Sequence, residues 1–185
     1  MAAIQMEQLR SAVRGAVIQP GHEAYESARK VYNAMIDKRP AIIVRCVDVA
    51  DVIAAIDYAR TNKLLTAVRG GGHNGGGLGT CDNGLVIDLS AMRGVRVDPV
   101  ARTVRVAAGC VWGDVDHATH PFGLAVPTGF ISSTGVAGLT LGGGIGYLTR
   151  QYGLTIDNLV SADVVLADGS TVTRSLMLCQ CAGML

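Results

Sequence analysis

The chain has few charged residues, and their charges nearly cancel. Charged side chains make up 17% of the 185 residues, below the average for soluble domains, and the formal net charge is +1 at pH 7. This balance gives no electrostatic reason to expect nucleic acid or an anionic membrane as a partner. The hydrophobic fraction of 49% is ample for the buried core of one domain, or one and a part.

Long apolar runs are also missing. No apolar stretch approaches the length needed to cross a bilayer, so we expect no membrane segment. The N-terminus places Glu7 close to Arg10 and lacks a continuous apolar core, which argues against a secretion signal. We therefore expect a cytoplasmic location.

The cysteines do not form a disulfide pattern. There are 5 of them, an odd number without regular spacing. Cys179 and Cys181 form an isolated C-x-C pair with no second pair or histidine nearby, so we expect no metal site. Cys46 and Cys110 are expected to be ordinary buried core residues.

The order of predicted elements is typical of an α+β fold built around mixed sheets. Helical spacing of apolar residues predicts helices over 6–14, 23–35, 52–61 and 111–119, the third capped by Asp48 or Asp51. Apolar runs predict strands over 41–44, 64–68 and 84–88. Two hairpins are predicted, one turning over 98–102 and one at Asp168-Gly169.

A histidine lies inside a glycine-rich segment, VRGGGHNGGGLGT at 68–80, directly after one of these strands. Glycines reach positive φ and let amide N–H groups converge on an anion. The segment has no Lys-Ser/Thr pair, so it is not a Walker loop, and it does not open into a helix as a dinucleotide fingerprint does. Taken alone, it could be only a tight loop with a structural histidine.

A second glycine cluster, at 127–153, interleaves glycines with threonine and serine hydroxyls. Backbone amides and short hydroxyls satisfy the oxygens of a buried pyrophosphate without bulky side chains. Neither cluster supplies a lysine to the phosphates, which argues against phosphoryl transfer. Arg69 and Arg150 are available to neutralise the negative charge of the phosphates. Two clusters in one modest domain indicate a dinucleotide-like cofactor held between two loops.

These motifs resemble one known family. RGGGHN at 69–74 resembles the flavin-attachment loop of FAD-linked oxidases of the vanillyl-alcohol oxidase/p-cresol methylhydroxylase (PCMH-type) fold, in the berberine-bridge-enzyme-like branch. GVAGLTLGGGIGYLTRQYGLTIDNL resembles the second FAD segment of that branch, and DVVLADGS resembles its strand pair beneath the adenine.

The resemblance implies a PCMH-type FAD-binding domain with two small α/β subdomains at 39–174, incomplete at its C-terminus. A helical lead-in at 1–38 precedes it. The tail at 175–185 is unlike the family, and we expect a frameshift or premature stop near Arg174.

The same resemblance implies FAD as the cofactor and assigns its contacts. His73 corresponds to the histidine that bonds through a ring nitrogen to the 8α-methyl of the flavin, and a neutral imidazole is a good nucleophile near pH 7. Many members attach FAD a second time, through a cysteine at the position of Ile131. An isoleucine cannot form that bond, so here we expect attachment through His73 alone. The cofactor-binding set is Arg69, Gly70, Gly71, Gly72, His73, Asn74, Gly75, Thr128, Gly129, Thr134, Gly135, Gly138, Gly144, Gly146 and, through its backbone to the adenine, Val165.

The implied activity is that of an FAD-dependent oxidoreductase. It would oxidise an alcohol or sugar-like small molecule by hydride transfer to flavin N5, with dioxygen as acceptor. No residue of the chain is assigned as the catalytic base. His117 and His120 are expected to have surface or capping roles, and Asp157 with Asn158 to fix a turn. The alternative is a noncatalytic, truncated FAD-binding fragment.

Overall fold

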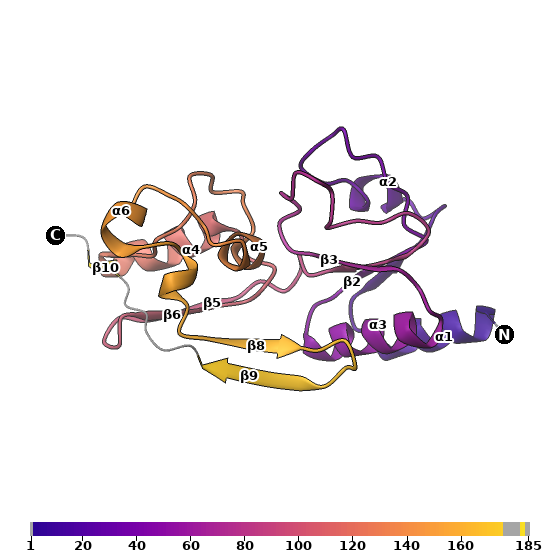
Figure 1. Cartoon of the computed structure of the whole chain (residues 1–185). Coiled ribbons are helices and arrows are strands. Elements are labelled where there is room, and N and C mark those ends of the chain that lie inside the picture. Colours follow the sequence, from indigo (N-terminus) through magenta and orange to yellow (C-terminus); the bar gives the residue numbers. More distant parts are fainter. Residues whose placement is uncertain (1, 176–181, 184–185) are drawn as a thin grey trace.

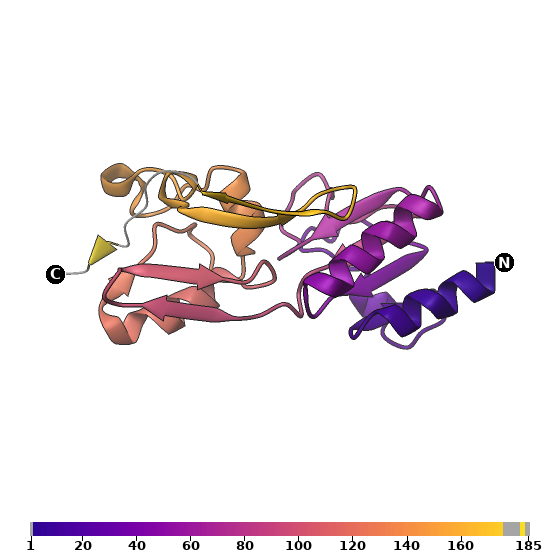
Figure 2. The ribbon, with the colours of Figure 1, turned by 90° about the horizontal axis from the view of Figure 1, so that it is seen from below.

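The computed structural model describes residues 2–175 and 182–183 as an α+β protein with two lobes. The first lobe holds β1 to β4 and α1 to α3, and the second holds β5, β6 and α4 to α6 (Figure 1). The β8–β9 hairpin runs from the second lobe toward α3 of the first, as both views show (Figures 1 and 2). Arg60 of α3 donates to the backbone oxygen of Asp168 at the hairpin tip, at 3.0 Å. The expected α+β class with two small subdomains is confirmed.

The first lobe is built on a four-stranded sheet with the order β1-β2-β4-β3. The strands are β1 (Ala16–Ile18), β2 (Ile42–Arg45), β4 (Leu85–Asp88) and β3 (Thr66–Arg69). Strands β2 and β3 lie parallel to β4 on either side, while β1 lies antiparallel to β2. The carboxyl ends of three parallel strands therefore meet at one edge of the sheet.

Both faces of this sheet are covered. Helices α1 (Ala2–Ala12) and α3 (Val49–Thr61) pack on one face around Val44, and the short α2 (Tyr25–Ala28) packs on the other face around Ile43. Successive side chains of a strand point to opposite faces, so the apolar run of β2 supplies both cores.

The start of α3 settles which of two aspartates is its cap. The Asp48 carboxylate accepts a hydrogen bond from the Asp51 amide at 3.0 Å, as an N-cap does. Asp51 is fully buried and accepts hydrogen bonds from the backbone N–H groups of Arg14 (2.7 Å), Gly15 (3.0 Å) and Val47 (2.9 Å). Its carboxylate thus joins α1, β1 and β2 to the helix that follows them.

The helix predicted over 23–35 is wrong for most of its length. Helix α2 covers only Tyr25–Ala28, and Tyr32 and Met35 are 65% and 89% exposed instead of sharing its buried face. The physical reason is tertiary. The Tyr32 amide donates to the Gly72 carbonyl at 3.1 Å, so this backbone pairs with the glycine-rich loop and not with the preceding helical turn.

The second lobe contains both predicted hairpins. Strands β5 (Val95–Asp98) and β6 (Thr103–Val106) form one, β8 (Ser161–Val165) and β9 (Thr171–Ser175) the other. The remaining elements are α4 (Trp112–Thr119), η1 (His120–Phe122), β7 (Leu124–Ala125), α5 (Val136–Leu141), α6 (Thr149–Tyr152), η2 (Ile156–Asn158) and β10 (Ala182–Gly183), which pairs with β7.

Burial of the cysteines agrees with the prediction for Cys46 and Cys110, and Cys81 is buried as well. Burial raises the pKa of the Cys46 thiol to about 12. Cys179 and Cys181 lie outside the described residues. Within the described ranges, no helix is long and apolar enough to cross a membrane, and no three His, Cys, Asp or Glu side chains gather as a metal site.

Candidate functional site

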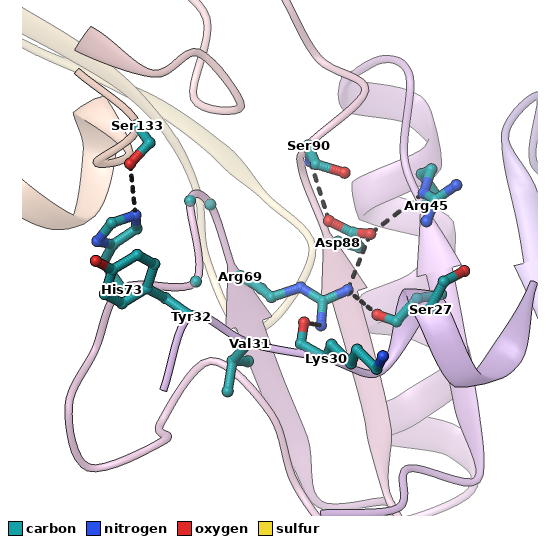
Figure 3. Close-up of a pocket in the computed structure, with 14 residues that line it drawn as sticks. Ser27, Lys30, Val31, Tyr32, Arg45, Arg69, His73, Asp88, Ser90 and Ser133 are labelled. Carbon is teal, nitrogen blue, oxygen red and sulfur yellow. Dashed lines mark hydrogen bonds and ion pairs between the residues drawn. The ribbon is translucent and has the colours of Figure 1, made fainter. Parts of the chain in front are cut away.

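The glycine-rich loop borders a cavity of about 520 Å³ at the carboxyl ends of β2, β4 and β3. Its wall is partly backbone, from Gly70 to Gly72. Side chains from distant segments complete it, and Figure 3 shows how they converge: Lys30, Tyr32, Arg45, Arg69, His73, Asp88, Ser90 and Ser133. In open α/β sheets this edge, beyond the carboxyl ends of parallel strands, is where ligands commonly bind.

The loop lines this cavity with four consecutive residues, Gly70 to His73. Among the described residues, none accepts a hydrogen bond from the backbone N–H of Gly70, Gly71, Gly72 or His73. Gly72 has a φ of +72°, a conformation that glycine reaches without strain. A run of amides with no protein acceptor, beside a left-handed residue, is suited to an anion such as a phosphate.

The two glycine clusters meet backbone to backbone. A Cβ on Gly71 would lie 2.4 Å from the Gly135 nitrogen, and a Cβ on Gly135 would lie 2.4 Å from the Gly71 nitrogen. No side chain fits at either position, because these distances are well inside van der Waals contact. The structure therefore brings together the two loops that the sequence predicts to share one cofactor.

A segment without regular structure, residues 31–38, holds the glycine-rich loop from outside. We call this segment the strap. The Asn33 side-chain amide donates to the Gly75 carbonyl at 3.2 Å, and the Lys38 ammonium donates to the Gly77 carbonyl at 3.0 Å. Together with the bond from the Tyr32 amide, these contacts fix the loop along its length.

The imidazole of His73 is held between two side chains. Its ring stacks on the Tyr32 ring with a centroid distance of 4.0 Å and an interplanar angle of 17° (Figure 3). On its edge, the Nε2 atom lies 3.4 Å from the Ser133 hydroxyl, which belongs to the second glycine cluster. His73 is half-buried and lines the cavity, so it is accessible to a ligand there.

A charged row crosses the floor of the site. Arg45, Asp88 and Arg69 are the last residues of β2, β4 and β3, and the sheet register places them side by side. The Asp88 carboxylate lies 3.0 Å from the Arg69 guanidinium and 3.3 Å from that of Arg45, and it accepts from the Ser90 amide at 3.1 Å.

Asp88 and Arg69 are both deeply buried, with side chains 2% and 6% exposed. Burial alone would raise the pKa of the Asp88 carboxyl, but the charge and hydrogen bond of Arg69, helped by Ser90, outweigh it and lower the pKa below its ordinary value. Asp88 is therefore ionised at neutral pH, and its negative charge offsets the positive charges of Arg69 and Arg45 beneath the loop.

Arg69 has a different environment from the one expected of a phosphate partner. Besides Asp88, its guanidinium donates to the carbonyl of Ala28 at 2.6 Å and to that of Lys30 at 3.4 Å. These contacts join β3 to the end of α2 and to the residue just before the strap. The charge of Arg69 is already balanced by Asp88, whereas Lys30 also lines the cavity and is exposed.

Three residues of the predicted set, Thr128, Gly129 and Gly146, lie in the second glycine cluster away from the first cavity. Thr128 and Gly129 line a separate cavity of about 330 Å³. Its wall includes Phe130 and Tyr147, whose rings meet edge to face at 4.9 Å. Gly146 closes against this segment, since a Cβ there would lie 1.6 Å from the Thr128 carbonyl oxygen.

Several predicted residues have local roles in the structure. The Asn74 side chain accepts from the Leu78 amide at 3.1 Å, and Gly144, with a φ of +79°, packs against Thr155. Val165 lies in β8, paired with Thr171. Thr134, Gly138, Gly144, Gly146 and Val165 line neither of the two cavities given above.

The residues expected to be structural are so. His117 and His120 are exposed, and His120 is the C-cap of α4. The Asp157 carboxylate accepts from the Leu154 amide at 2.8 Å, and the Asn158 side chain donates to the carbonyls of Tyr152 and Leu154, both at 2.8 Å. This pair fixes a turn, as predicted.

Six of the cavity side chains named above lie outside the set predicted from the sequence: Lys30, Tyr32, Arg45, Asp88, Ser90 and Ser133. One sequence signal for two of them exists. Arg45 and Asp88, like Arg69, each end a short apolar run, and a charged residue in that place lies at the carboxyl edge of a parallel sheet. No local signal identifies Tyr32, because its partner His73 is distant in the sequence.

The comparisons with known proteins agree with this geometry. The model of a family described as FAD binding domain matches residues 40–175. The structure of 6-hydroxy-D-nicotine oxidase from Arthrobacter nicotinovorans is 36% identical with a TM-score of 0.87, over 88% of this chain and 36% of that one. BBE-like 1 from Physcomitrella patens is 30% identical with a TM-score of 0.87, over 92% and 37%.

Xylooligosaccharide oxidase from Myceliophthora thermophila C1, solved with xylobiose, is 31% identical with a TM-score of 0.85, over 92% of this chain and 37% of that one. The chain spans about a third of the length of the curated relatives it matches. Two of these relatives, an FAD-linked oxidoreductase from Dictyostelium discoideum and (R)-6-hydroxynicotine oxidase from Paenarthrobacter nicotinovorans, are 42% and 36% identical to it. The region that the family model matches contains both glycine clusters and most of the residues that line the cavity at the strand ends. The chain belongs to the FAD-binding-domain family of PCMH-type, berberine-bridge-enzyme-like oxidoreductases.

Proposed function

We propose that the chain supplies the FAD-binding part of an oxidoreductase that transfers a hydride from an alcohol or sugar-like small molecule to flavin N5, with dioxygen as acceptor. The observation that carries the proposal is the run of backbone N–H groups from Gly70 to His73, which have no acceptor among the described residues, in a loop that lines a cavity of an FAD-binding domain. Relatives named for the oxidation of 6-hydroxynicotine and of xylooligosaccharides support a small-molecule substrate.

The residues present fit this cofactor. The amides of Gly70 to Gly72 suit the pyrophosphate, and the exposed Lys30 on the cavity wall adds positive charge. The close approach of Gly71 and Gly135 leaves no side chain between the two loops. When bound, FAD supplies the redox chemistry, and the protein supplies binding and orientation.

His73 is the proposed point of covalent attachment. Its imidazole lines the same cavity and follows the amide run directly, so a flavin bound through its pyrophosphate has a nucleophile nearby. Ile131 has no group that forms a bond to flavin, and His73 is therefore the single attachment residue that we propose. In the overall reaction the 8α-methyl loses a C–H bond and the imidazole an N–H bond, while an N–C bond forms. Dioxygen takes the two electrons and two protons as hydrogen peroxide.

A second function, a noncatalytic FAD-binding module, is favoured by one observation. The chain spans about a third of the length of its curated relatives. In this case the flavin is held but no substrate is oxidised.

Retention of FAD tests the proposal. We expect the purified chain, incubated with FAD and passed through a desalting column, to keep a yellow flavin with quenched fluorescence. Anaerobic addition of primary alcohols and of sugars then separates the two functions. Bleaching of the flavin absorbance shows hydride transfer by this chain, whereas retained flavin without bleaching supports the noncatalytic module. Loss of all flavin on the column would contradict both.

A further inference from the structure

We propose that Tyr32 and Ser133 are positioning residues for the bond between His73 and FAD: they hold the imidazole in the orientation and tautomer in which it reacts. The inference rests on the proposed function, because it concerns how the proposed attachment takes place. It assigns a role to Tyr32, which lies outside both glycine motifs and outside the family match, and to Ser133, whose contact with His73 no motif shows.

Tyr32 fixes the plane of the imidazole. The two rings lie nearly parallel, 4.0 Å apart, and the backbones of their segments are joined by the Tyr32 amide bond to the Gly72 carbonyl. Because one face of the His73 ring is covered by tyrosine, rotation of the imidazole breaks the stack. The strap therefore positions both the glycine-rich loop and the side chain of His73 within it.

Ser133 acts on the edge of the ring. Its hydroxyl oxygen lies 3.4 Å from Nε2, and a hydroxyl can either donate to this nitrogen or accept from it. In the arrangement that we propose, the hydroxyl accepts. A hydroxyl that accepts from Nε2–H leaves the Nδ1 lone pair free to form the bond to the 8α carbon. The proton lost from the imidazole then leaves from Nε2, on the side of Ser133.

The contact also joins the two glycine clusters at the reacting residue. His73 lies within the first cluster, and Ser133 precedes the Gly135 that touches Gly71. The imidazole is thus oriented only when both loops are in place. Attachment should therefore follow the binding of FAD by the assembled loops, and it should be slower than binding.

The test measures the rate of covalent attachment separately from binding. The 185-residue chain is mixed with FAD, and samples are denatured in acid at intervals. Flavin fluorescence on the polypeptide band and the intact mass give the covalently modified fraction. We expect Tyr32→Ala to slow attachment by about tenfold, and Tyr32→Phe, which keeps an aromatic ring, to restore most of the rate. The dissociation constant for FAD should change by a smaller factor than the rate of attachment in Tyr32→Ala.

Ser133→Ala should also slow attachment by about tenfold, because the tautomer is no longer selected, and it should change the dependence of the rate on pH. Ser132→Ala is the matched control, since the neighbouring hydroxyl makes no described contact with His73. Wild-type rates in Tyr32→Ala and Ser133→Ala, with FAD attached to His73, would overturn the positioning roles alone. A wild-type chain that binds FAD but never attaches it would overturn both this inference and covalent attachment. Equal losses of attachment and FAD affinity would show a merely structural role.

Discussion

Replacing Asp88 with alanine is expected to lower the free energy of unfolding by about 3–5 kcal/mol, the largest effect of any single substitution considered for stability. The carboxylate is 2% exposed and lies between the guanidinium groups of Arg69 and Arg45. Its removal leaves the charge of Arg69 buried without a partner. Urea unfolding followed by circular dichroism at pH 7 measures the change.

A surface carboxylate provides the control. Asp57 pairs with Arg60 on α3 at 2.8 Å, but both side chains are half exposed, so Asp57→Ala should cost less than about 1 kcal/mol. The double variant Arg69→Met with Asp88→Leu should lose less stability than the sum of its single changes, because the deeply buried charge of Arg69 is removed together with its partner, while Arg45 is partly exposed to solvent. Equal losses from Asp57→Ala and Asp88→Ala would contradict the role of the charged row.

The acid dependence of stability follows from the same carboxyl group. The folded-state pKa of Asp88 is lowered, so its contribution is fully present above the unfolded pKa of about 4 and is lost as pH falls through the folded pKa. The stability difference between wild type and Asp88→Asn should therefore be constant from pH 5 to 7 and shrink below about pH 4. Urea titrations of both proteins at each pH measure that difference, and a difference that grows in acid would contradict the assignment.

Replacing Gly71 with alanine is expected to reduce FAD affinity by about a hundredfold, the largest effect considered on the cofactor. The new Cβ would lie 2.4 Å from the Gly135 nitrogen and 2.6 Å from its Cα. Both neighbouring atoms are backbone and cannot rotate away, so the two loops must separate by about 1 Å. A displacement of that size strongly weakens a site built from converging backbone groups.

Quenching of flavin fluorescence during titration with protein measures the affinity. Gly94→Ala is the matched control: a Cβ there has no atom within 4 Å, and Gly94 lies outside both glycine clusters. Gly94→Ala should bind FAD as wild type does. Circular dichroism at the assay temperature shows whether Gly71→Ala remains folded, because overpacking itself costs about 1–3 kcal/mol. A folded Gly71→Ala chain with wild-type affinity would mean that the junction of the two loops does not hold FAD.

Strands and hairpins could be predicted because their signals are local. The apolar runs that became β2, β3 and β4 end within two residues of their predicted bounds, and Asp98 closes its turn by accepting from the Val100 amide at 3.0 Å. The helix over 23–35 failed because its backbone is used elsewhere. The apolar spacing is real, but the Tyr32 amide bonds to Gly72. Local periodicity carries no information about that partner.

In the candidate site, too, local sequence signals predicted some features, and contacts between distant segments could not be predicted. The two glycine-rich loops and His73 could be predicted because dense glycine clusters and a histidine among glycines are visible in the sequence itself. Arg69, which the motif places in the cofactor-binding set, lines the cavity, but its ion pair with Asp88 at 3.0 Å is set by the order of strands in the sheet. The stack of Tyr32 on His73 likewise depends on where the strap crosses the loop. Such contacts follow from topology and packing, which a motif does not contain.

We propose that the two glycine clusters assemble into an FAD site with His73 as its attachment point. The most direct test is to express the chain with FAD, denature it in acid and examine the polypeptide band for flavin fluorescence. We predict fluorescence that stays with the wild-type chain and disappears in His73→Ala, while His73→Ala still binds FAD reversibly. Flavin that is released from the wild-type chain by acid would contradict covalent attachment, and a chain that never takes up FAD would contradict the site itself.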